Sequence, residues 1–279
     1  MMAGTILFAL LSLHAGDEGA DAYLYQPRYL IDHELVGPAT PYHPQAGDIM
    51  LATDTSIFWI VMHNVALTSH PTHSGIIFKR RDGTMAVLEG GPHDTVRCRS
   101  LDALPHLKSY EAEGRVWIRK RAVPLTDEQS ENLTQWAEGQ DGKIFALQRL
   151  AFQLTPFRPR GPFTAYYGKP CGHKRNTFFC SELVMESCCA AGLVCRETAR
   201  PSATYPRDLF FDSSINPYIN KHLKLAPEWD PPARFTSHGC ADDLPACKGK
   251  GAHGQAPGHG KPQDPGKGQA PAKSSLKGK

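Results

Sequence analysis

The chain has 279 residues, 41% of them hydrophobic, and a formal net charge of +3. This length and apolar content allow one large folded domain with a substantial core. Seven Lys and one Asp between Lys248 and Lys279 give that stretch a formal +6, so the rest of the chain is near −3. The basic character therefore belongs to the C-terminal stretch, and no sequence-specific nucleic-acid binding is expected of the folded part.

The N-terminus has the features of a secretory signal. An apolar run from Thr5 to Leu13 is too short to cross a bilayer and is followed by small residues, with an A-x-A cleavage pattern at Ala20-Asp21-Ala22. No Lys or Arg precedes the run, and a buried N-terminal strand or helix is the alternative. We predict a signal peptide over residues 1–22 and a secreted or periplasmic protein. No other stretch of the sequence is long enough to be transmembrane.

Short apolar runs predict four strands in the first half of the chain. A turn at Gly47-Asp48 opens the first, and an Asp-Gly pair typical of a hairpin turn separates the second from the third. The predicted strands are Ile49 to Ala52, Ser74 to Phe78, Thr84 to Leu88 and Arg115 to Arg119. The strand content indicates a small antiparallel sheet.

The predicted hairpin brings His73 and Glu89 together, because the start of its first strand lies beside the end of its second. A loop centred on Arg81 pairs the two residues directly. A tight turn at Asp82-Gly83 shifts the register by three. In either case an imidazole and a carboxylate are expected near one end of the sheet, although a solvated strand-end carboxylate is an equally good interpretation of Glu89.

Helices are predicted to follow. Thr126 and Gln129 form a capping box before an amphipathic run that ends near Glu138. A more apolar stretch from Ile144 to Leu154 predicts a second helix. The segment from Pro156 to Asn176 is irregular, and is either a loop that covers the substrate or a structural excursion.

Cys180 stands where this irregular segment meets an apolar helix that is expected to end near Gly192. Unpaired N–H groups at a helix N-terminus stabilise a thiolate, and Lys174 and Arg175 lie just upstream. A thiolate at Cys180 with His73 as its base predicts a cysteine hydrolase or acyltransferase, with Glu89 orienting the imidazole. The backbone N–H of Cys180 is the first candidate donor to an oxyanion.

Competing chemistries have weaker support. His63, His70 and His93 are alternatives to His73, but Pro71 between His70 and His73 disfavours a helical metal-binding pair, so no metal or cofactor is expected. No G-x-S-x-G motif supports a serine nucleophile.

The remaining cysteines are assigned to other roles. Cys240 and Cys247 are the best candidates for a disulfide. Cys188, Cys189 and Cys195 are expected to be buried thiols that pack as small apolar residues.

The order of these motifs resembles the circularly permuted branch of the NlpC-type papain-like peptidases, the YiiX-like proteins, whose order lecithin:retinol acyltransferases share. The segment from Tyr205 to Leu209 is similar to the Pro-containing stretch that follows the catalytic helix in YiiX-like proteins. The resemblance rests on Gly47-Asp48-Ile49-Met50-Leu51, His73-Ser74-Gly75-Ile76-Ile77-Phe78, Glu89 and Cys180-Ser181-Glu182-Leu183-Val184.

The resemblance implies an α+β, permuted papain-like fold in which a small antiparallel sheet packs against helices, including the one that carries the nucleophile. Cys180 then matches the nucleophile, His73 the base and Glu89 the polar third residue. The catalytic domain is expected to span residues 23–238. The Lys/Gly/Pro-rich tail over residues 239–279 is expected to be disordered, and either contacts an anionic surface or only improves solubility.

The predicted function is that of a cysteine peptidase or amidase. Its substrate is a peptide or another amide, and a secretory signal favours the stem peptides of peptidoglycan. An acyltransferase of the lecithin:retinol type is the first alternative, because it uses the same residues with an acceptor other than water. A non-enzymatic envelope-binding module on a degenerate papain-like fold is the second.

Overall fold

The computed structural model describes residues 22–25, 39–53, 60–61, 63–64, 68–91, 96–146, 170–172 and 176–237. Several predictions lie outside these ranges: the signal peptide apart from its last residue, the basic tail, the Cys240–Cys247 disulfide, and the positions of Lys174 and Arg175. The predicted domain boundaries and location stay predictions. None of the helices in the described ranges has the length and apolar character needed to cross a bilayer.

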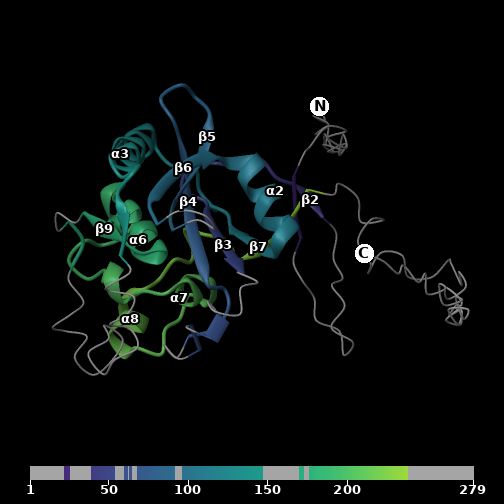
Figure 1. Cartoon of the computed structure of the whole chain (residues 1–279). Helices are drawn as coiled ribbons and strands as arrows, with labels where there is room; N and C mark the ends of the chain where they lie inside the picture. The colour runs from purple at the N-terminus through teal and green to yellow at the C-terminus, as the bar shows by residue number, and fades with distance from the viewer. Residues whose placement is uncertain are drawn as a thin grey trace, which may run out of the picture.

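An eight-stranded sheet with only antiparallel neighbours forms the centre of the fold, in the order β2-β1-β10-β7-β3-β4-β5-β6 (Figure 1). The α+β class is confirmed, but the sheet is larger than predicted. Its outer strands were not predicted, because they are short or come from the far end of the chain. Its strands are β1 (Tyr23–Tyr25), β2 (Thr40–Pro41), β3 (Ile49–Thr53), β4 (His73–Lys79), β5 (Met85–Gly90), β6 (Cys98–Asp102), β7 (Arg115–Arg119) and β10 (Ala233–Thr236).

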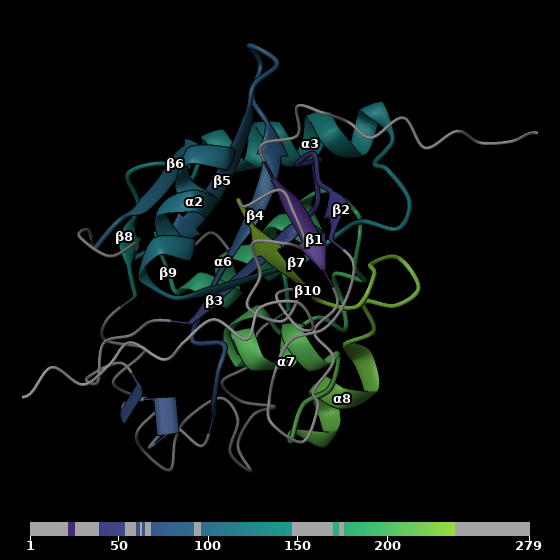
Figure 2. The ribbon, with the colours of Figure 1, turned by 90° about the vertical axis from the view of Figure 1, so that its right-hand side faces the viewer.

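Helices cover both faces of this sheet. In Figures 1 and 2, α2 (Ala103–Glu113) lies on one face, and α3 (Asp127–Glu138) and α6 (Cys180–Ala190) lie on the other. The alternation of side chains along β4 separates two cores: Ile76 and Phe78 pack with α6, whereas Ile77 packs with α2. Shorter helices, η1 (Pro201–Ala203), α7 (Pro206–Phe211) and α8 (Pro217–His222), complete the side that carries α6.

The hairpin of β4 and β5 has a register between the two that were predicted. Gly75 lies opposite Glu89, so His73 is two positions away on the same face of the sheet. The backbone N–H of Arg80 donates to the Thr84 carbonyl at 2.8 Å, and Gly83 has φ +90°. A loop of residues 81–83 therefore closes the hairpin, and His73 meets Glu89 diagonally, within reach of long side chains.

Asp48 fixes the start of β3 beside β4. Its carboxylate is fully buried and accepts hydrogen bonds from the Arg121 N–H at 2.7 Å and the Tyr42 hydroxyl at 2.8 Å. Burial outweighs these bonds and raises the pKa of Asp48 to about 6. The turn at Gly47-Asp48 is thus tied to Arg121, two residues beyond the end of β7.

The helix predictions have mixed outcomes. The capping box of α3 is confirmed, with Gln129 N–H donating to Thr126 Oγ1 at 3.2 Å and Thr126 N–H donating to Gln129 Oε1 at 3.0 Å. The predicted helix from Ile144 is wrong at its start. Ile144–Phe145 forms strand β8, which pairs in parallel with β9 (Thr177–Phe178), because neighbouring backbone takes up its hydrogen bonds. Residues 147–154 lie outside the described ranges.

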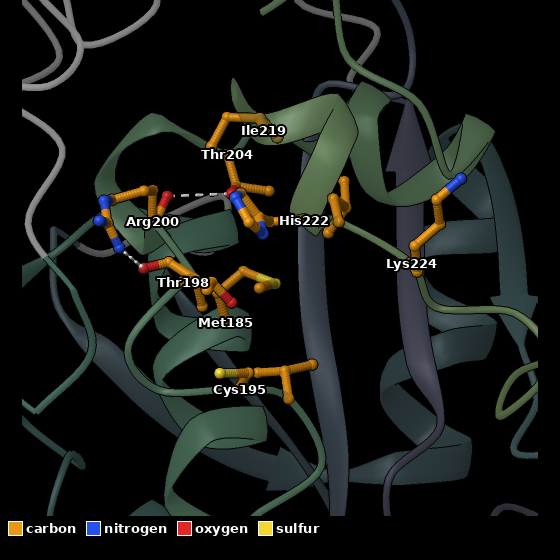
Figure 3. A pocket seen from close by; sticks show the side chains of 11 residues that line it. Met185, Cys195, Thr198, Arg200, Thr204, Ile219, His222 and Lys224 are labelled. Atoms are coloured by element: carbon orange, nitrogen blue, oxygen red, sulfur yellow. Dashed lines mark hydrogen bonds between the residues drawn. The ribbon is translucent and has the colours of Figure 1, made fainter. Parts of the chain in front are cut away.

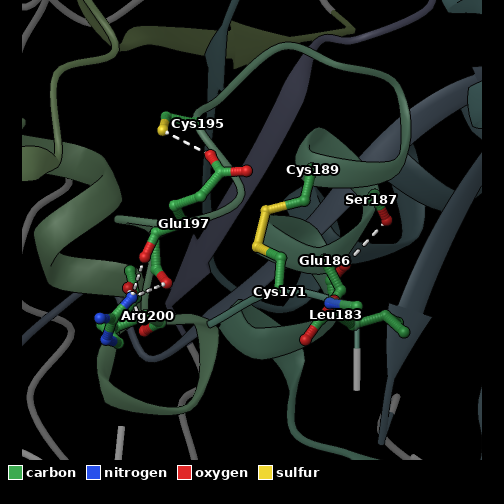
Figure 4. The surroundings of a disulfide bond; sticks show 11 residues. Cys171, Leu183, Glu186, Ser187, Cys189, Cys195, Glu197 and Arg200 are labelled. Carbon is green, nitrogen blue, oxygen red and sulfur yellow. Dashed lines mark hydrogen bonds between the residues drawn. A yellow bond between two sulfur atoms is a disulfide. The ribbon is translucent and has the colours of Figure 1, made fainter. Parts of the chain in front are cut away.

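The cysteine assignments also need correction. Cys189 is not a free buried thiol but forms a disulfide with Cys171, with Cα atoms 6.2 Å apart (Figure 4). Cys195 is exposed rather than buried, whereas Cys188 is buried as predicted. The partner of Cys189 is Cys171, in the segment before α6, and no local sequence signal pairs the two residues.

We predict that Gly75→Ala destabilises the β4–β5 hairpin. A Cβ at this position would lie 2.8 Å from Val87 Cγ1 and 3.1 Å from the Leu88 carbonyl oxygen, so the strands would have to move apart. The expected loss in the free energy of unfolding is about 1–3 kcal/mol, measured by urea denaturation. Gly139→Ala is the matched control, because its nearest neighbour is 3.4 Å away. An equal effect of the two substitutions would contradict the prediction.

Candidate active site

Cys180 is the first residue of α6, directly after an extended Phe179 with φ −101° and ψ 167°. The Phe179 N–H donates to Glu182 Oε2 at 3.4 Å, which ties the chain entering the helix to its first turn. Cys180 itself is 8% exposed. The thiol therefore lies at the positive end of a well-anchored helix, as its sequence context predicts.

His73, the first residue of β4, hydrogen-bonds the Cys180 sulfur. Its Nε2 lies 2.7 Å from Glu89 Oε2, which leaves Nδ1 as the ring nitrogen that can face the sulfur. The His73 side chain is 12% exposed and that of Glu89 is 0% exposed. The structure thus brings together all three predicted residues, although they come from different elements.

Glu89 has two further polar neighbours that the sequence did not reveal. The Tyr110 hydroxyl donates to Oε2 at 3.1 Å, and His106 Nε2 lies 2.6 Å from Oε1. Both residues are on α2 and four positions apart, so they share one face of the helix. The interpretation of Glu89 as a solvated strand-end carboxylate is wrong, because α2 covers it.

The charges in this cluster favour one another. Burial raises the pKa of Glu89, but its contacts with His106 and His73 outweigh burial and lower that pKa to about 2. Burial lowers the pKa of His73, but its bonds to Cys180 and Glu89 outweigh burial and raise it to about 10. The stable arrangement is therefore an imidazolium between a carboxylate and a sulfur.

The same balance acts on the sulfur of Cys180. Burial raises the pKa of the thiol, but the hydrogen bond and charge of His73, with smaller contributions from the Ser74 side chain and the Ser181 N–H, bring it below the usual value. The buried thiols of Cys98 and Cys188 have no such partner, and burial raises the pKa of each to about 12. Cys180 therefore has the environment of a reactive thiolate.

The other histidines considered from the sequence do not join this cluster. His70 is exposed and His63 is partly exposed, while His93 lies outside the described residues. Ser181 Oγ donates to the Thr204 carbonyl at 2.6 Å, inside the protein. Within the described ranges, no group of His, Cys, Asp and Glu side chains has the arrangement of a metal site.

A separate hollow of about 20 Å³ lies between Met185 of α6, the loop around Arg200 and His222 of α8 (Figure 3). It has room for about one water molecule. Neither Cys180, His73 nor Glu89 lines it. The hollow is therefore distinct from the candidate active site.

Comparisons with known proteins find similarity at the level of structure. No family model matches the chain, and no curated protein matches it. A crystal structure of the metalloprotein yiiX from Escherichia coli O157:H7 is similar at 16% sequence identity and a TM-score of 0.38, over 74% of this chain and 95% of that chain. At these values no residue role and no metal is transferred from that protein.

We predict that Glu89→Gln removes a pH-dependent part of the stability. The pKa of Glu89 in the folded protein, about 2, is below its ordinary value of 4.5, so its stabilising contribution is present above about pH 4.5 and is lost as the pH falls toward 2. The difference in unfolding free energy between wild type and variant should shrink by roughly 3 kcal/mol over that range.

Urea denaturation of both proteins at a series of pH values measures this difference. Glu131→Gln, at an exposed position of α3, serves as the control and should change the unfolding free energy by less than about 0.5 kcal/mol. A difference between wild type and Glu89→Gln that stays constant with pH would show that Glu89 is not held as a carboxylate.

Proposed function

We propose that the protein is a thiol hydrolase that cleaves an amide bond through Cys180, His73 and Glu89. The observation that carries the proposal is the continuous chain of contacts from the Cys180 sulfur through the His73 ring to Glu89 Oε2 at 2.7 Å. A nucleophile, its base and a third group that orients the base are the parts that covalent acyl transfer requires.

In the first step, the Cys180 thiolate attacks the carbonyl carbon of the amide and forms a tetrahedral oxyanion. The N–H of Cys180, at the start of α6, is the candidate donor to this oxygen. The C–N bond then breaks, and the His73 imidazolium gives its proton to the leaving amine. The product of this half-reaction is a thioester on Cys180.

In the second step, neutral His73 takes a proton from water, and the resulting hydroxide attacks the thioester. The C–S bond breaks, the carboxylic acid product leaves, and Cys180 returns to the thiolate with His73 protonated. Glu89 stays ionised throughout and stabilises each imidazolium. No cofactor is needed for this sequence of steps.

The proposed fold family is the permuted papain-like arrangement. It is supported by the order of elements along the chain, in which β3, β4 and β5 come before the helix that bears the nucleophile. The proposed substrate is a peptide or a related amide, with peptidoglycan stem peptides as the first class to test. Product analysis with and without an added amine or alcohol acceptor distinguishes hydrolysis from acyl transfer.

We predict that iodoacetamide at pH 6 alkylates Cys180 before the other free cysteines of the described region. His73 lowers the pKa of this thiol, whereas burial raises the pKa of Cys98 and Cys188 to about 12. Peptide mapping by mass spectrometry at short reaction times identifies the labelled site. Cys195 is exposed and reports the background rate. Labelling of Cys180 no faster than Cys195 would remove the basis for the proposal.

We also predict that Cys180→Ala abolishes amide cleavage and that His73→Gln lowers kcat by at least about 10³-fold. Cys195→Ser should keep wild-type activity, because this side chain lies outside the contact chain of the three residues. Assay of the purified full-length chain with a panel of peptides and muropeptides measures all three. Cleavage that persists in Cys180→Ala would assign the activity to another site.

A further inference from the structure

The Glu89 carboxylate presents its two oxygens to two different histidines. Oε2 lies 2.7 Å from His73 Nε2, and Oε1 lies 2.6 Å from His106 Nε2. This contact has the distance of an ion pair but not the geometry of a hydrogen bond, and neither of its two atoms has a hydrogen-bond partner within the described ranges. His106 therefore is the one group there that can satisfy the second oxygen of a fully buried carboxylate.

We propose that His106 is a positioning residue that fixes the Glu89 carboxylate against His73, and through this pair determines how low the pH can fall before Cys180 loses its thiolate. This inference rests on the proposed function of Cys180 and His73. It adds a fourth residue, on α2 rather than α6, that acts on the sulfur only through Glu89 and His73.

Burial of the Glu89 carboxylate costs free energy. A carboxylate removed from water is stable only when its oxygens accept hydrogen bonds or face positive charge. His73 and the Tyr110 hydroxyl both approach Oε2, so they leave Oε1 to His106. Without a donor at position 106, one oxygen of the buried anion would be uncompensated, and protonation of Glu89 would be the cheapest relief.

Protonation of Glu89 would be felt at Cys180. A neutral carboxyl no longer stabilises the positive charge of His73, and a less stable imidazolium supports the thiolate less well. The interaction between His73 and Glu89 raises the pKa of His73 and lowers that of Glu89. The effect of His106 thus passes through two intermediate side chains before it reaches the nucleophile.

Other charged groups around Glu89 do not substitute for His106. Arg99 of β6 is the register partner of Glu89, but it is exposed to solvent, where screening weakens its effect. From β4 the group that faces Glu89 is His73, which also contacts Cys180 of α6, and from α2 the facing groups are His106 and Tyr110. Among these, only His106 meets Oε1.

Tyr110 holds both rings in place. It stacks on His73 with centroids 5.6 Å apart and meets the His106 ring edge-on at 4.8 Å. His106 could therefore contribute packing alone, and the test must separate its ring from its nitrogen. His106→Phe keeps an aromatic ring against Tyr110 but removes the N–H, whereas His106→Gln keeps an amide N–H near the position of Nε2.

The test compares rates of Cys180 alkylation by iodoacetamide as a function of pH. The rate for His106→Phe at pH 6 should be at least roughly tenfold below wild type, because a shift of one pKa unit changes the thiolate fraction tenfold. The profile of His106→Gln should stay close to that of wild type. Thermal melting of each variant establishes that it is folded, and His106→Leu replaces His106→Phe if the latter is not.

An independent measurement keeps the inference separate from the proposed function. In a Cys180→Ala background, NMR titration of the His73 ring, assigned with His73→Gln, reports the His73–Glu89 pair without the thiol. His106→Phe should lower the midpoint of this titration by about one unit or more, and His106→Gln should restore it. If wild-type Cys180 is unreactive, the proposed function fails, and this titration still decides the role of His106.

Two outcomes overturn the inference. In the first, His106→Phe titrates like wild type in both measurements, which would mean that the nitrogen has no influence on the pair. In the second, Phe and Gln variants shift the profiles equally, which would mean that only the shape of the ring matters.

Discussion

The buried carboxylate of Glu89 is the constraint on which the site depends. An anion with no exposed surface requires donors from every side, and it obtains them from His73 on β4 and from His106 and Tyr110 on α2. These contacts can form together only if the β4–β5 register and the position of α2 are both correct. The electrostatics of one side chain thus link the sheet to the helix that covers it.

The sheet separates the two halves of the proposed chemistry. Tyr110 and His106 approach Glu89 from the face covered by α2, whereas Cys180 belongs to the helix on the opposite face. His73 joins the two halves because it is the first residue of β4, at the end of the strand, where a side chain can contact both layers. A residue in the middle of the strand would be confined to one face.

Local patterns in the sequence predicted the central strands, the capping box of α3 and the start of α6 at Cys180. They gave two registers for the hairpin, and neither is the observed one, because a three-residue loop and a two-residue turn have similar sequences around Gly83. They did not reveal α2, which has Pro105 in its first turn and no side-chain cap. His106 and Tyr110 were missed with it, since their role comes from packing between elements distant in sequence. The Cys171–Cys189 disulfide was missed for the same reason.

This disulfide completes an arrangement in which the proposed nucleophile, Cys180, is held from both ends of its helix. At the N-terminal end of α6, Glu182 Oε2 accepts a hydrogen bond from the Phe179 N–H, and Ser181 Oγ donates one to the Thr204 carbonyl. Near the other end, Cys189 is bonded to Cys171, and the Gly172 N–H donates to Glu186 Oε2 at 3.0 Å (Figure 4).

A helix fixed in this way cannot shift along its axis without breaking contacts at both ends, so the Cys180 sulfur keeps its distance from His73. The proposed base, His73, is fixed independently by the sheet and by α2. Acyl transfer requires nucleophile and base to be aligned before the substrate arrives, because alignment during the reaction would add to its barrier. The separate anchoring of α6, the sheet and α2 provides that alignment from three parts of the fold.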